Sequence, residues 1–143
     1  MNWITITEDD LPAVIAAKAR TIAQGANDAI PAALSEGISR VRRAVAPGNS
    51  LDADFSTVPT SLKGVATRIA LFDLMVRIRM TLTPDQCEAR DNDISDLKRM
   101  ADMKIRVEPA DNPIPDGQAI QRQPSPRIEK RPRSFTERNM DGI

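Results

Sequence analysis

The chain has 143 residues, of which 41% are hydrophobic, and it carries 20 basic and 20 acidic side chains, so its formal net charge is zero. A protein that binds nucleic acid through bulk charge needs an excess of cations, so this balance argues against a histone-like protein. The sequence has no histidine and one cysteine, Cys87, which excludes histidine-based catalysis, histidine metal sites, an intramolecular disulfide and a cysteine-rich zinc site.

The first expected helix runs from Thr7 to Gln24. Thr7 is a common N-cap residue, three acidic residues follow it, and Asp10 stands where a capping box needs its partner. Apolar residues then recur at spacings of three and four, which is the periodicity of an amphipathic helix. Pro12 falls near the first turn, where proline is tolerated. Gly25 offers a C-terminal stop.

The second expected helix opens at Pro31 and ends before the turn at residues 47–49. One apolar stripe runs along it, formed by Leu34, Ile38, Val41 and Val45. Gly37 lies beside this stripe, and a glycine costs a helix about 1 kcal/mol relative to alanine. Its position therefore indicates that another helix packs closely at this point. Three basic residues at the end of this helix favour an exposed patch, where cations suit the helix dipole: Arg40, Arg42 and Arg43.

The third expected helix begins at Pro59 or Thr60 and runs to about Met80. Its apolar residues cover more than one face, which is typical of a central helix or of a helix that faces a second copy of itself. A core of about 100 residues does not need this much apolar surface, so we expect part of the helix to pack against a neighbouring copy. The residues assigned to that interface are Val65, Ile69, Phe72 and Val76.

The fourth expected helix has the clearest start. Thr83 is its N-cap, Pro84 takes the first helical position, and Gln86 completes a capping box. The helix should end near Arg106. Residues 88–93 are almost wholly polar, so we expect that half of the helix to be exposed. Strand content in the core should be near zero.

These elements predict an all-α fold, a small bundle of about four helices in residues 1–108, with a long extended C-terminal arm in residues 109–143. Six of the eleven prolines fall in the arm, and each removes a backbone donor and restricts the residue before it. The arm is too polar to fold alone but can dock scattered side chains on a partner. Its candidate partner-binding residues are Arg127, Ile128, Arg131, Phe135, Met140 and Ile143.

Two acidic clusters have the residue types of a metal site. Asp52 and Asp54 form an Asp-x-Asp pair in a loop with no evident further ligand, and a solvated loop is the favoured interpretation. The second cluster lacks the glycine turn and terminal glutamate of a calcium loop, and an exposed helix face explains it better. Its members are Asp91, Asp93 and Asp96.

No catalytic set is evident in the sequence. Cys87 has no histidine to activate it, and the six glycines form no phosphate-binding loop. We therefore expect no enzymatic activity and no cofactor. No segment reaches the roughly 18 apolar residues of a membrane span, and the N-terminus lacks the pattern of a secretory signal, so a cytoplasmic site of synthesis is expected.

Three stretches resemble the Mu-like head–tail connector family of tailed phages and prophages, whose members are also called head-completion or adaptor proteins. Residues 59–75, PTSLKGVATRIALFDLM, resemble a family helix that starts after proline and carries an Arg-Ile-Ala-like core. Residues 96–107, DLKRMADMKIRV, resemble the family's closing helix, which ends in an Ala-x-Gly-Lys-Val-like turn. Residues 133–143, RSFTERNMDGI, resemble a family ending of Phe, a polar run, then Gly and one apolar residue.

The resemblance implies a virion structural protein at the neck, assembled in the host cytoplasm as a ring, expected to be twelvefold, beneath the portal protein. Such a ring joins capsid to tail, offers a surface to a tail terminator or stopper protein, and lets packaged DNA pass without sequence-specific binding. No membrane is involved. Two alternatives remain open, a nucleic-acid-binding helical packaging or regulatory factor and a phage assembly chaperone that is absent from purified virions.

Overall fold

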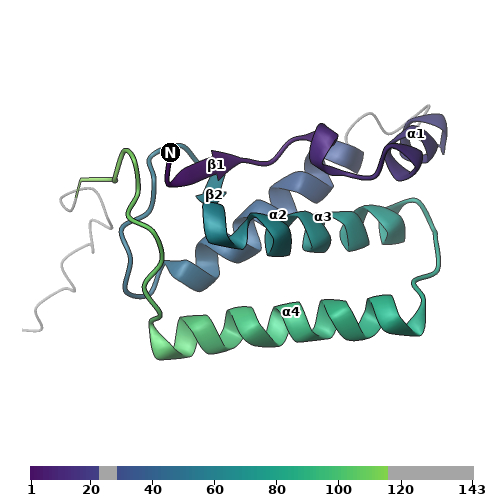
Figure 1. The fold of residues 1–143 in the computed structure, drawn as a ribbon. Coiled ribbons are helices and arrows are strands. Elements are labelled where there is room, and N and C mark those ends of the chain that lie inside the picture. The colour runs from purple at the N-terminus through teal and green to yellow at the C-terminus, as the bar shows by residue number, and fades with distance from the viewer. Residues whose placement is uncertain (23–28, 116–143) are drawn as a thin grey trace, which may run out of the picture.

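The computed structural model describes residues 1–22 and 29–115, and its helices form a small bundle (Figure 1). The elements in chain order are β1 (Trp3–Thr5), the 3-10 helix η1 (Glu8–Asp10), α1 (Ala13–Ile22), α2 (Ala29–Val45), β2 (Thr57–Pro59), the 3-10 helix η2 (Thr60–Leu62), α3 (Lys63–Arg77) and α4 (Pro84–Met103). In Figure 1, α4 runs alongside the α2–α3 pair, and α1 lies at one end of the bundle. The four α-helices confirm the expected fold class.

The α2–α3 pair is the centre of the fold, and it closes around Gly37. A Cβ atom at Gly37 would lie 2.5 Å from the backbone oxygen of Ala66 and 3.1 Å from the Cβ of Ala70. Only glycine leaves room for the α3 backbone at this crossing. The close approach expected from the sequence is therefore confirmed.

The first expected helix is broken in two, so the prediction of one continuous helix was wrong. Thr7 and Asp10 do form a capping box, but it caps only η1, and Leu11 is extended with φ −89° and ψ 151°. A residue before proline avoids the helical region because the ring of Pro12 clashes with it. The helix restarts as α1 at Ala13. The expected C-terminal end, at Gln24 and Gly25, lies outside the described residues.

A short sheet corrects the expectation of near-zero strand content. β1 and β2 pair antiparallel, with Trp3 opposite Pro59 and Thr5 opposite Thr57. Trp3 and Val58 are buried in the same apolar cluster as α2 and α3. The sheet thus pins the N-terminus of the chain to the segment that leads into α3.

The segment after α4 is extended, but it belongs to the folded unit beyond the expected boundary at residue 108. The carboxylate of Asp111 accepts hydrogen bonds from the backbone N–H groups of Asn2 and Trp3. The backbone N–H of Ile114 donates to the carbonyl of Leu51 at 3.0 Å. The contacts of the folded unit therefore reach at least Ile114, and residues 116–143 lie outside the described residues.

The ends of α3 and α4 are set by local backbone chemistry. α3 stops at Arg77, before the expected Met80, and Arg79 then adopts a left-handed φ of 59°. The Thr83–Gln86 capping box that begins α4 is confirmed. α4 ends at Met103, and Lys104 turns the chain with a left-handed φ of 51°, so the expected end near Arg106 was too late.

Two apolar clusters fill the interior. The first lies under the sheet and includes Trp3, Val41, Val45, Val58 and Ile69. The second lies toward α1 and includes Leu11, Ala19, Ala33, Leu74 and Ile78. The buried residues of α4 are Asp93 and Leu97 alone, so this helix is attached to the bundle by a narrow stripe.

Candidate interaction surface

Three of the four residues predicted to face a neighbouring copy line one groove between α3 and α4. This groove, the α3–α4 groove, has a volume of about 190 Å³ and is lined by Ile69, Phe72 and Val76, with Ile94 of α4 across from them. Ile69 and Phe72 are buried in the chain's own core, whereas Val76 is 53% exposed. Val65 is partly buried against the first apolar cluster and does not line this groove. The accessible apolar residues of the groove are therefore Val76 and Ile94.

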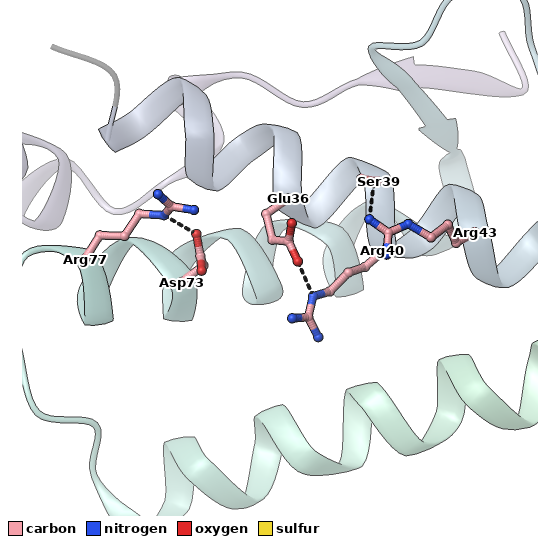
Figure 2. A network of polar contacts seen from close by, with 6 residues as sticks. All are labelled: Glu36, Ser39, Arg40, Arg43, Asp73 and Arg77. Carbon is pink, nitrogen blue, oxygen red and sulfur yellow. Dashed lines mark hydrogen bonds and ion pairs between the residues drawn. The ribbon is translucent and has the colours of Figure 1, made fainter. Parts of the chain in front are cut away.

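Charged side chains from α2, α3 and α4 line the α3–α4 groove, and they are Glu36, Arg40, Asp73 and Arg90. Figure 2 shows the ion pairs that Glu36 and Asp73 make within their own helices. The Nε atom of Arg40 donates to Glu36 at 2.7 Å, and the Nε atom of Arg77 donates to Asp73 at 2.5 Å. The hydrogen bond that Arg77 donates to Asp73 raises the pKa of Arg77. Both are exposed i,i+4 pairs within one helix, and such pairs contribute little to stability. The groove lining holds two acidic and two basic side chains, so its formal charge is zero.

A second groove continues from the first along α2 and α4, because Arg40 and Ile94 line both. This α2–α4 groove has a volume of about 250 Å³ and adds Arg43, whose guanidinium donates to Ser39 at 3.0 Å, and Lys98. Its floor is apolar, and no acidic side chain lines it among the described residues. An apolar floor beside three cations suits a partner segment that is both acidic and apolar.

The position of α4 depends on an ion pair that the sequence did not reveal. Arg68 of α3 donates from Nε and from one terminal nitrogen to the two carboxylate oxygens of Asp93, each at 2.8 Å. This hydrogen bonding raises the pKa of Arg68. Asp93 is only 7% exposed, so the expectation that residues 88–93 are all exposed was wrong. The signal was present, because Asp93 precedes the buried Leu97 by four residues and so shares its face.

Arg42 is the second residue for which the sequence-based prediction, an exposed basic patch, was wrong. Arg40 and Arg43 are exposed as expected, but Arg42 is buried, which lowers its pKa. Its guanidinium donates to three backbone carbonyls of the loop after α2, those of Asp52 at 2.6 Å, Asp54 at 2.9 Å and Thr57 at 2.9 Å. It also lies 5.3 Å from the centre of the Trp3 ring and 5.5 Å from that of Phe55. Arg42 thus holds the loop rather than a ligand.

The Asp-x-Asp pair is part of the same loop, and its first member is not solvated. The Asp52 carboxylate is buried and accepts hydrogen bonds from the backbone N–H groups of Asp54 and Asn112. One oxygen stabilises the turn of its own loop at Asp54, and the other joins that loop to Asn112. Within residues 1–22 and 29–115, no group of three or more acidic or cysteine side chains is placed to hold a metal ion.

The remaining candidates divide by position. Cys87 is a half-buried free thiol in the first turn of α4. The six partner-binding residues predicted in the arm lie outside the described residues, and these are Arg127, Ile128, Arg131, Phe135, Met140 and Ile143. None of the described helices combines the length and the apolar character needed to cross a membrane.

Comparison with known proteins gives no relative: no family model, no curated protein and no solved structure matches the chain.

Proposed function

We propose that the protein is a virion structural protein, a head–tail connector that assembles as a ring beneath the portal of a tailed phage and joins capsid to tail. Its partners are neighbouring copies in a ring expected to be twelvefold, the portal protein, and a tail terminator or stopper. Packaged DNA passes through the channel without sequence-specific binding. The site of action is the virion neck, after assembly in the host cytoplasm.

The observation that carries the proposal is the exposed apolar pair at the α3–α4 groove. Val76 and Ile94 remain accessible on a bundle whose own core is already closed by α2 and α3. The charged side chains around them offer paired groups to a neighbour without a net charge that would repel an identical copy. A surface of this kind suits side-by-side packing of identical copies.

The family resemblance supports the same proposal at two places in the described chain. Pro59 is followed at once by η2 and then by α3. This agrees with the family's pattern of a helix that starts after proline. Residues 96–107 span the second half of α4 and the turn behind it. The left-handed residue there is Lys104, which aligns with the Lys of the Ala-x-Gly-Lys-Val-like turn, whereas Met103 stands where that turn has Gly. Only the position of the turn therefore agrees with the family's pattern.

A pair of matched substitutions tests this function. Val76→Asp places a charge in the α3–α4 groove, and Val14→Asp makes the same change on α1, where Val14 is 78% exposed. Both variants should fold, since both positions face solvent. We expect phage that depend on Val76→Asp to lose infectious yield by at least about 100-fold and to lack the protein in purified particles. Val14→Asp should support normal particles.

Purified particles also separate the alternatives. Detection of several copies per neck supports the connector. If the protein is present in the lysate but missing from wild-type particles, it is an assembly chaperone. If the protein is retained on DNA and this retention falls with added salt, it is a nucleic-acid-binding factor. A single copy per neck, or normal particles from Val76→Asp, would end the proposal of a ring built on this groove.

A further inference from the structure

A groove larger than the two described above does not belong to the surface proposed as the ring interface. It runs along α2 beside the loop of residues 51–56, with a volume of about 670 Å³. Leu34, Ile38 and Leu51 supply an apolar lining, and Phe55, which is 76% exposed, stands at its edge. Arg43 also lines the α2–α4 groove, so the two grooves are neighbours. We call this larger one the α2–loop groove.

The end of the described chain pairs with a segment that includes Leu51, a residue of the groove lining. Residues 112–114 run antiparallel to residues 51–53, with the N–H of Ala53 donating to Asn112 at 2.8 Å and the N–H of Ile114 donating to Leu51 at 3.0 Å. Leu51 itself lines the groove. The chain that continues after Pro115 therefore starts beside the groove.

We propose that the α2–loop groove is the docking site of the next stretch of the same chain, residues 116–123, with Ile120 as its apolar anchor. Ile120 follows Pro115 by five residues, over which an extended chain covers about 17 Å. The groove lining runs back along α2 from Ala46 to Pro31, fifteen residues that rise about 22 Å. Ile120 can thus reach most of the groove's length from the Leu51 side, but not its far end at Pro31.

Charge at the entrance fits this occupant. Arg42 and Arg43 line the groove, and no acidic side chain does so among the described residues. Arg42 is buried and already holds the loop, so Arg43 is the exposed cation. Asp116 is the first residue after Pro115, so the proposed segment begins with an acidic side chain.

Attachment favours the chain's own segment over that of a second copy. One aliphatic anchor and one exposed ion pair are too weak to join separate molecules at micromolar concentration. A segment tethered by a few residues instead meets its site at an effective concentration in the millimolar range. The same short segment can therefore occupy the groove of its own chain. This inference does not depend on the connector function, and it leaves the residues beyond 123 to engage a partner.

Disulfide trapping in the full-length chain tests the docking. In a Cys87→Ser background, Gln121→Cys is combined with Ser35→Cys, an exposed position that lines the groove. The matched control combines Gln121→Cys with Ser95→Cys, an exposed position on α4. We expect the groove pair to form an intramolecular disulfide at least about tenfold faster than the control pair, at a rate independent of protein concentration. Adding Ile120→Asp to the groove pair should lower its rate to that of the control.

Three results would overturn the inference. They are equal rates for the two cysteine pairs, a groove-pair rate that Ile120→Asp leaves unchanged, and disulfide-linked dimers whose yield rises with protein concentration. The last result would assign the groove to the segment of a second copy. Circular dichroism of each variant verifies that the bundle is intact, and because both serines are exposed, these substitutions leave the core untouched.

Discussion

The α2–α3 pair and α4 are held in the same bundle by different kinds of interaction. α2 and α3 meet backbone to backbone at Gly37, and the two apolar clusters join them along their length. α4 buries only Asp93 and Leu97, and it is held to the bundle by the Arg68–Asp93 ion pair and by the packing of Leu97 and Met100 on the first apolar cluster. Close backbone packing specifies the first arrangement, whereas one ion pair and a narrow apolar stripe specify the second. The grooves proposed for partner contacts lie along α4, whose attachment is weaker than that between α2 and α3.

The largest expected effect comes from opening the α2–α3 crossing. Gly37→Ala places a Cβ atom 2.5 Å from a backbone oxygen that cannot move independently, so we expect the free energy of unfolding to fall by about 3 kcal/mol, the upper range for overpacking. Urea unfolding followed by circular dichroism measures it.

Gly64→Ala is the matched control, because a Cβ atom at this exposed position of α3 meets only the tip of Arg68 at 3.6 Å. It should stabilise the protein by about 0.5–1 kcal/mol through the higher helix propensity of alanine. Equal stabilities of the Gly37→Ala variant and the natural protein would show that the helices do not cross at this glycine.

Loss of the ion pair that holds α4 should have a smaller effect. Asp93→Ala removes both acceptors of Arg68, and we expect a loss of about 1–2 kcal/mol, below the cost of breaking a fully buried pair because Arg68 is half exposed and can regain water. The same unfolding measurement applies. Asp96→Ala, at an exposed position of α4, should change stability by less than about 0.5 kcal/mol. If Asp93→Ala and Asp96→Ala had the same free energy of unfolding, the ion pair with Arg68 would not be what positions α4.

Acid should weaken the contacts that lie outside α4. Hydrogen bonds from the backbone N–H groups of Trp3 and Asn2 lower the pKa of Asp111, and a hydrogen bond from Lys63 lowers the pKa of Asp10. A carboxyl group whose pKa is lowered by folding stabilises the fold above its unfolded pKa of about 4, and that contribution is lost as the pH falls through the folded pKa.

We therefore expect the free energy of unfolding to be level between pH 7 and 5 with respect to these groups and to decline below about pH 4. Denaturant titrations across this range measure the decline, which should be shallower for Asp111→Asn than for the natural protein. An identical pH dependence in the two proteins would mean that Asp111 does not tie the chain ends together.

The smallest expected effect belongs to the exposed ion pairs at the α3–α4 groove. Asp73→Asn breaks the exposed pair with Arg77 (Figure 2), and such pairs contribute no more than about 0.5 kcal/mol. Thermal unfolding at low and at high salt should therefore differ little between Asp73→Asn and the natural protein. A larger loss would place this pair among the contacts that hold the bundle together.

Local signals in the sequence predicted much of the bundle. The Thr83 capping box begins α4 where expected, and Gly37 marks the helix crossing, because each signal concerns residues close in the chain or a single backbone position. The break at Leu11 was also local and was available from Pro12. The three-residue strands were not predictable in this way, since β1 exists only because β2, more than 50 residues later, pairs with it.

The residues of the candidate surface also differ in whether local sequence signals could predict them. Apolar periodicity identified Ile69, Phe72 and Val76, which the fold gathers at one groove. Periodicity did not identify Arg42 or Asp93, because a charged residue is expected to be exposed unless its partners are known. The partners of Arg42 are carbonyls 10 to 15 residues away, and the partner of Asp93 is Arg68, 25 residues away. Helical spacing places Asp93 on the face of Leu97, but no periodicity within one helix identifies the partner on another element.

Hydrogen–deuterium exchange of the full-length protein tests most directly whether α2–α3 and α4 differ as described. Amides in a tightly packed core exchange only when the whole domain unfolds, while a segment held by few contacts opens on its own. We predict that amides of α4 exchange well before those of α2 and α3, and that Asp93→Ala accelerates exchange in α4 alone. Exchange of α4 together with α2 and α3, in a single cooperative step, would contradict the distinction between them.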